Sequence, residues 1–147
     1  MRKIFFFNAD RTGSFKNKTI IKDLIESLFK EERVSLDRIN YIFCSDEYLF
    51  AINRTYLKHN TLTDIITFPL SDRNNPVFAE IYISIERIKE NAKAYNVSYE
   101  NELLRVLIHG ALHLCGYKDK SKLDKQKMRV KEHYYLNQTD VSREANL

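Results

Sequence analysis

Two histidines, His109 and His113, are the residues most able to carry out chemistry in this chain, and they stand within the apolar stretch from Glu100 to Asp119. Side chains four positions apart lie on one face of an α-helix, so the two imidazoles can bind a single ion. Gly116 can end such a helix in the left-handed conformation, and the chain can then turn and bring Asp119 back to the histidines. The spacing His-x3-His-x2-Gly-x2-Asp therefore predicts a metal site with His109, His113 and Asp119 as its ligands.

The ligand types indicate which metal would bind and what it would do. Two imidazoles and one carboxylate favour Zn2+, with one ion per chain. Three protein ligands leave a fourth position for water, as in catalytic zinc sites, where the ion acts as a Lewis acid or activates its water. The alternative is that His109 and His113 are hydrogen-bonded core residues without a metal. The glycine turn and the carboxylate favour the metal.

The same ligand spacing occurs in zincin metallopeptidases, but one element of their motif is absent. In those enzymes a glutamate directly follows the first histidine and acts as general base. Gly110 stands at that position here. The pattern therefore indicates a metal site and argues against the usual peptidase mechanism.

The sequence leaves the catalytic base unassigned, although it offers acidic candidates. Glu102 shares the histidine face of the helix, two turns earlier, and an ion pair with Arg105 at i, i+3 is its favoured role. Asp64 and Glu80 stand near the starts of predicted strands. We expect structural hydrogen bonds, or support of the metal ligands, from both.

The elements that would position these residues follow from hydrophobic periodicity and capping residues. Four strands are predicted, over residues 3–8, 38–45, 63–70 and 79–84. Helices are predicted to begin at Thr19, Ser45, Ser84, Ser98 and Ser121. The helix after Ser98 carries the histidines and is apolar on nearly all sides, so we expect it to be buried. This pattern predicts an α+β domain in which about five helices pack on a mixed four-stranded sheet.

Length and composition indicate one compact domain over residues 1–147, with 44% hydrophobic residues and only three glycines and two prolines. We expect the polar tail beyond about residue 139 to be flexible. The apolar run at residues 4–7 is too short for a signal peptide or a membrane span. Cys44 and Cys115 have no framework spacing, so we expect free thiols and a cytoplasmic protein that does not bind membranes.

The net charge of +4 is unevenly distributed along the chain. Between Lys118 and His133 there are seven lysines and arginines but only three acids, so this segment accounts for the whole excess. A basic helix beside a metal site is suited to a polyanionic substrate, because phosphate contacts provide most non-specific affinity for nucleic acids. The alternative is an ordinary solvated helix face.

Three segments of the chain resemble one known family. Residues 109–119, HGALHLCGYKD, resemble the signature of the YbeY family of bacterial zinc-dependent rRNA-maturation endoribonucleases. Residues 53–69, NRTYLKHNTLTDIITFP, and residues 79–84, AEIYIS, are similar to two further segments of that family. The resemblance covers most of the chain. It implies a zincin-like fold, in which the metal helix lies against the sheet and the site opens into a cleft.

The resemblance also implies a function. It suggests a single-strand-specific, metal-dependent endoribonuclease that acts in rRNA maturation and ribosome quality control. Its partners would be ribosomal RNA, the ribosome and ribosomal proteins, and the oligomeric state is left open. The main alternative keeps the fold without the chemistry: a ribosome-assembly or RNA-binding factor with a structural metal and little nuclease activity.

Two departures from the family pattern affect the site. The family signature usually ends Gly-Tyr-Asp-His, whereas Lys118 and Asp119 stand here, so the third ligand would be a carboxylate instead of an imidazole. Leu57 occupies the position of a family arginine, so no catalytic arginine is carried over. Arg54 and Lys58 lie close by in sequence and are the cations that could reach a phosphate in its place.

Overall fold

The computed structural model describes residues 1–56 and 63–139. Leu57 and Lys58 lie outside these residues, as does the tail that the sequence predicts to be flexible. The described elements, in chain order, are β1 (Ile4–Asn8), α1 (Lys18–Glu31), β2 (Leu36–Cys44), α2 (Asp46–Tyr56), β3 (Ile65–Pro69), β4 (Val77–Ser84), α3 (Ile85–Tyr95), α4 (Tyr99–Leu114) and α5 (Lys122–Leu136).

The four strands form one mixed sheet in the order β1-β2-β4-β3. β2 pairs in parallel with both β1 and β4, while β3 pairs with β4 in the antiparallel direction. With five helices in the described residues, this is the predicted α+β architecture. β3 is an edge strand: it pairs with β4 on one side and with no other strand of the described residues on the other.

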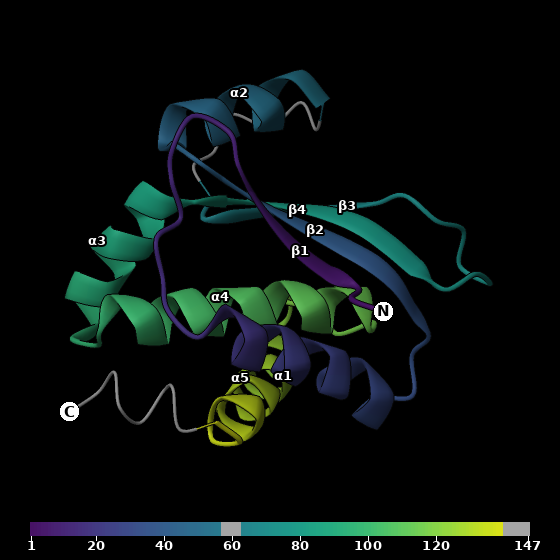
Figure 1. The fold of residues 1–147 in the computed structure, drawn as a ribbon. Coiled ribbons are helices and arrows are strands. Elements are labelled where there is room, and N and C mark those ends of the chain that lie inside the picture. The colour runs from purple at the N-terminus through teal and green to yellow at the C-terminus, as the bar shows by residue number, and fades with distance from the viewer. Residues whose placement is uncertain (57–62, 140–147) are drawn as a thin grey trace.

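The helices are arranged around the sheet in layers. Figure 1 shows α4 against one face of the sheet with α1 and α5 beyond it, while α2 lies over the opposite face. The main core lies between the sheet, α1 and α4, and it includes Leu28, Tyr41 and Leu107, each fully buried. The Tyr41 hydroxyl donates to the Leu107 carbonyl at 2.8 Å, which ties the middle of the sheet to the buried helix. The predicted burial of α4 is therefore confirmed.

Gly110 lies where α4 packs closely against β3 and β4. A Cβ atom added there would lie 2.9 Å from Ile65 Cδ1 and 3.1 Å from Ile81 Cδ1. Such distances are shorter than van der Waals contact, so the two isoleucine side chains would have to shift to admit a larger residue. The close packing of Gly110 therefore disfavours a glutamate at the position that holds the general base in zincin peptidases.

Most predicted helix starts are confirmed by capping hydrogen bonds. The hydroxyl oxygens of four serines accept from the backbone N–H three residues later: Ser45, Ser84, Ser98 and Ser121. The prediction of Thr19 as a cap was wrong, because α1 begins one residue earlier at Lys18 and its cap is Asn17. Asn17 has φ 61° and ψ 38°, a left-handed conformation that asparagine tolerates better than threonine, and its carbonyl accepts from Ile21 N–H at 3.0 Å.

Neither cysteine of the described chain forms a disulfide. Cys44 is fully buried and Cys115 is partly buried. Burial raises the pKa of each thiol to about 12, so both remain protonated and unreactive at neutral pH. None of the described helices combines the length and the hydrophobicity needed to cross a membrane.

Candidate metal centre

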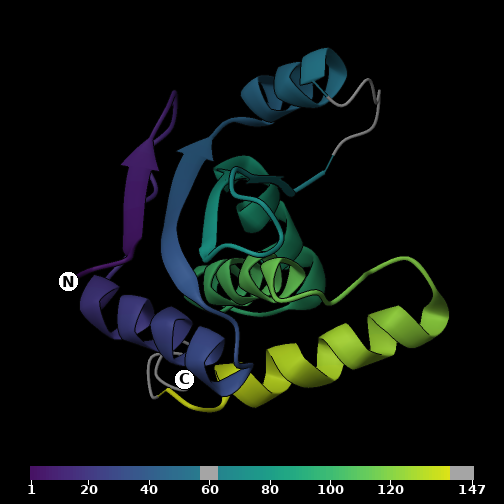
Figure 2. The ribbon, with the colours of Figure 1, turned by 90° about the vertical axis from the view of Figure 1, so that its right-hand side faces the viewer.

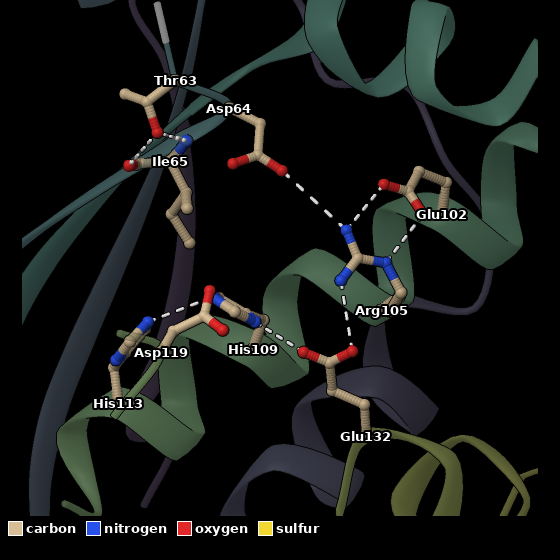
Figure 3. Close-up of polar contacts among 9 residues, drawn as sticks. All are labelled: Thr63, Asp64, Ile65, Glu102, Arg105, His109, His113, Asp119 and Glu132. Carbon is tan, nitrogen blue, oxygen red and sulfur yellow. Dashed lines mark hydrogen bonds and ion pairs between the residues drawn. The ribbon is translucent and has the colours of Figure 1, made fainter. Parts of the chain in front are cut away.

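Three side chains converge at the C-terminal end of α4. His109 and His113 lie one helical turn apart, with their Nε2 atoms 3.0 Å from each other. Asp119, in the connection after the helix, places Oδ2 3.7 Å from His109 Nε2. The ligand atoms of all three lie within 4.8 Å of one another, and the described residues contain no other such group of three. Figure 3 shows the two rings and the carboxylate facing a common point.

The second nitrogen of each ring is already occupied. His113 Nδ1 lies 2.9 Å from the carbonyl oxygen of Tyr117, and His109 Nδ1 lies 2.5 Å from Glu132 Oε2. Both partners are acceptors, so each imidazole carries its proton on Nδ1 and presents the lone pair of Nε2. Zinc-binding histidines are held in this way, and the donor set therefore fits a divalent metal ion.

Glu132 belongs to a buried ion network around Arg105. The Arg105 guanidinium donates to both oxygens of Glu102 at 2.8 Å and to Glu132 Oε1 at 3.2 Å, and it lies 3.9 Å from Asp64 Oδ2. Figure 3 shows the guanidinium between these three carboxylates. The network joins α5, α4 and the residue before β3. It therefore fixes the position of the carboxylate that holds His109.

Two pKa shifts keep this arrangement ready for a cation. Burial opposes the ionisation of Glu132, but the hydrogen bond with His109 and the charge of Arg105 outweigh it and hold the pKa of that carboxyl below its usual range. Burial, together with the neighbouring His109, lowers the pKa of His113. A neutral imidazole and an ionised carboxylate are the states that metal binding requires.

A Schellman turn ends α4 and carries the chain to Asp119. Gly116 has φ 105°, its N–H donates to the His113 carbonyl at 3.0 Å, and Tyr117 N–H donates to the Leu112 carbonyl at 3.1 Å. The Tyr117 hydroxyl donates to Glu32 at 2.7 Å, which attaches the turn to the end of α1. The predicted glycine turn is thus present, and it places both the carbonyl that holds His113 and the third candidate ligand.

The candidate metal centre opens into a cleft of about 1320 Å³. His113 and Asp119 line the cleft together with the end of α4 and Gly116. Most of the remaining lining comes from the edge strand β3, the β3–β4 connection (residues 70–76) and residues 33–35, and Asn53 of α2 and Thr63 also contribute. The site thus lies at the side of an open groove, which admits a chain-like substrate.

Comparison with known proteins identifies the family. Residues 6–140 match the family model described as Endoribonuclease YbeY. The chain belongs to the YbeY family. A relative named Endoribonuclease YbeY from Flavobacterium johnsoniae is 48% identical over 126 residues, which are 86% of this chain and 90% of the relative. Another of that name, from Porphyromonas gingivalis, is 39% identical over 132 residues, which are 90% of this chain and 87% of the relative.

A solved structure supports the fold of this YbeY chain. The solution structure of TM1509 from Thermotoga maritima matches with a TM-score of 0.59 and 29% sequence identity. The match covers 92% of this chain and 90% of that one. The fold described above is therefore shared with an experimentally determined structure.

The structure also places the other residues that the sequence suggested for the candidate metal centre of this YbeY protein. Glu102 is 1% exposed, and the predicted ion pair with Arg105 is present. Asp64 also faces Arg105, at the far side of the network from the histidines. Arg54 is exposed on α2 with its guanidinium 5.9 Å from the Phe50 ring, and it does not line the cleft. Glu80 lies within β4, where the Tyr82 hydroxyl donates to it at 3.4 Å.

Glu132 was missed by reasoning from the sequence, although a signal was available. Met128, Tyr135 and Leu136 are buried on one face of α5, and Glu132 falls in the same stripe at helical spacing. A charged residue inside an apolar stripe is seldom buried without a partner. That rule shows that Glu132 needs a buried partner, but it does not name His109 or Arg105.

Proposed function

We propose that this chain is a metal-dependent endoribonuclease that binds one Zn2+ ion through His109, His113 and Asp119. The observation that carries the proposal is the common direction of the two Nε2 lone pairs while both Nδ1 atoms are engaged. The names of the relatives, which are endoribonucleases, support the reaction class. The groove beside the ligands supports a polymeric substrate.

We assign different roles to the residues at this site. A bound zinc ion would supply Lewis-acid stabilisation at a phosphoryl oxygen and lower the pKa of a water ligand. Glu132 and the Tyr117 carbonyl orient the two imidazoles, and Arg105 holds Glu132 in place. Glu102 has both oxygens engaged by Arg105 and is poorly suited to act as a general base. Asp64 stays an acidic candidate, and we assign no base.

The biological role that fits this activity is maturation of ribosomal RNA and ribosome quality control, with single-stranded rRNA as the substrate. The ribosome and its proteins would be the partners. We place this work in the cytoplasm, and the two unpaired cysteines agree with a reducing compartment.

The decisive experiment is cleavage of a purified single-stranded RNA by the purified protein. We expect cleavage to stop when a chelator removes the metal and to return when zinc is added. His113→Ala should abolish both zinc binding and cleavage while the circular dichroism spectrum stays unchanged. His133→Ala is the matched control, because His133 is an exposed histidine of α5 that lies outside the ligand group.

Two other outcomes would contradict the proposal. If the protein binds RNA and zinc but never cleaves, it is an RNA-binding assembly factor with a structural metal. If His113→Ala cleaves as well as the parent does, the metal centre is not the site of the reaction.

A further inference from the structure

The cleft contains cations that no other part of the described molecule neutralises. Arg33, Arg73 and Lys120 all line it, and none of their side chains has a hydrogen bond or ion pair within residues 1–56 and 63–139. Some cations outside the cleft are neutralised, as Arg87 is by Asp46 and Lys131 by Glu32. Unpaired cations lining a groove are available for an anionic ligand.

These three cations come from separate parts of the chain. Arg33 follows α1, Arg73 lies in the β3–β4 connection, and Lys120 follows Asp119 in the connection to α5. The acids of the cleft lining are Asp72 and the candidate metal ligand Asp119. With that ligand committed to a divalent ion, the groove is predominantly positive from the metal centre outwards. This charge is suited to a chain of phosphates.

The basic segment noted in the sequence contributes little to this groove. Of its seven cations only Lys120 belongs to the cleft lining. Lys118 precedes α5, and the other five lie on α5, which Figure 2 shows below α4, on the side away from α2. Lys131 is committed to Glu32 at 3.0 Å. The phosphate contacts near the metal are therefore not expected from α5.

The edge of β3 adds polar groups to the lining of the cleft. Ser84 N–H donates to the Asp64 carbonyl and Leu70 N–H donates to the Phe78 carbonyl, so the even-numbered residues of β3 bond to β4. In an antiparallel pair the intervening residues direct their N–H and C=O away from the partner strand. The Thr63 hydroxyl bonds to both the carbonyl and the N–H of Ile65. The outward N–H and carbonyl of Thr67 remain, and Thr67 lines the cleft.

We infer that a single RNA strand lies along this cleft, with its phosphates on Arg33, Arg73 and Lys120 and its base edges against Thr67 on β3. The inference rests on the proposed function and names how its substrate is held. Only unpaired bases have free Watson–Crick edges to offer to a strand backbone, so the geometry favours single-stranded RNA. An extended peptide could also pair with a free strand edge, but it would leave the three cations without anions.

The test compares two triple variants that remove the same charge. The cleft variant is Arg33→Gln, Arg73→Gln and Lys120→Gln; the α5 variant is Lys122→Gln, Lys125→Gln and Arg129→Gln. Binding of a short, unstructured, labelled RNA is measured by fluorescence anisotropy across a series of KCl concentrations. Each phosphate contact contributes about 0.7 to the slope of log affinity against log salt for single strands, so the cleft variant should flatten the slope by about two. The α5 variant should keep the slope of the parent.

Controls separate this inference from the proposed function. Zinc titration and circular dichroism of both variants should match the parent, because none of the six residues is a candidate ligand. A duplex of the same sequence and an unstructured peptide should each fail to compete. If the parent binds and cleaves RNA but the slope falls only in the α5 variant, or in neither, the inference is wrong and the function stands. If the peptide displaces the RNA, the cleft edge takes peptides. If the parent neither binds nor cleaves RNA, the proposed function itself fails.

Discussion

The two histidines of the candidate metal centre lie one turn apart on α4. The residues that hold them in place lie at very different distances along the chain. His113 donates to the carbonyl of Tyr117, four residues later in the turn that ends the same helix. His109 donates to the carboxylate of Glu132, twenty-three residues later on α5. One support is a backbone atom that no substitution removes. The other is an ionised side chain that depends on the packing of a second helix.

This difference implies that the two ligands respond to different perturbations. The support of His113 is determined by the conformation of the turn, through Gly116 and the attachment of Tyr117 to Glu32. The support of His109 is determined by the buried network around Arg105, which joins three elements. We therefore expect the geometry at His113 to depend on local backbone strain, and the geometry at His109 to depend on buried charge.

Removal of the third ligand, which neither support can replace, should have the largest effect. Asp119→Ala should weaken zinc affinity by more than the roughly 100-fold upper range for loss of a supporting residue, because it removes both a ligand and its negative charge. Asp119→His should restore most of the affinity, since it supplies an imidazole at the same position. Lys118→Ala is the control and should bind zinc normally in a competition titration. Equal affinities for all three variants would show that Asp119 is not a ligand.

Removal of Glu132, the distant support of His109, should have the second-largest effect. Glu132→Ala should weaken zinc binding by about 10- to 100-fold and should destabilise the metal-free protein by about 3 kcal/mol, because Arg105 loses a buried partner. Nitrogen NMR should show His109 losing its single tautomer while His113 keeps its own. Arg129→Ala, on the exposed part of α5, serves as the control. If both histidines change together, the two supports are not independent.

The local support is tested at the turn. Gly116→Ala should cost about 1–2 kcal/mol of folding free energy, because a residue with a Cβ is strained at φ 105°. An added Cβ meets no atom within 4 Å, so the cost is one of backbone strain and not of a clash. Zinc affinity should fall, because the turn positions His113 and Asp119. NMR should show that the tautomer of His109 is unchanged. Gly116→Asn, which tolerates positive φ better, should recover part of the loss. Unaltered stability in Gly116→Ala would rule out strain at the turn.

The attachment of the turn to α1 should give the smallest effect, and it should depend on pH. Burial would raise the pKa of Glu32, but hydrogen bonds from Tyr135 and Tyr117 and the Lys131 ammonium outweigh it and lower that pKa. The folded state therefore binds fewer protons than the unfolded state in mild acid. The stabilisation by Glu32 is fully present above the ordinary pKa of a carboxyl group. It is lost as the pH falls through the lowered pKa of Glu32 in the folded state. Glu32→Gln should be less stable than the parent by about 1 kcal/mol at neutral pH. Urea unfolding of metal-free protein should show the two converging in acid, and a constant gap at all pH values would contradict this.

Local patterns in the sequence were sufficient for the elements and for the candidate ligands. The helical period places His109 and His113 on one face, Gly116 ends the helix, and the serine caps at Ser84 and Ser98 are confirmed. Each of these depends on residues within about one helical turn of each other, where backbone geometry alone sets the distances. The ion pair of Glu102 with Arg105 was predictable for the same reason.

Only the tertiary structure decided the features that join distant segments. The strand order, the contact between Glu132 and His109, and the placement of Arg33 and Arg73 in one cleft with the metal ligands all depend on how helices pack on the sheet. The sequence also could not show that Asn17 and not Thr19 caps α1, because both residue types are good caps. Packing brings together residues that are far apart in sequence, and no periodicity in a single chain encodes which of the exposed faces will meet.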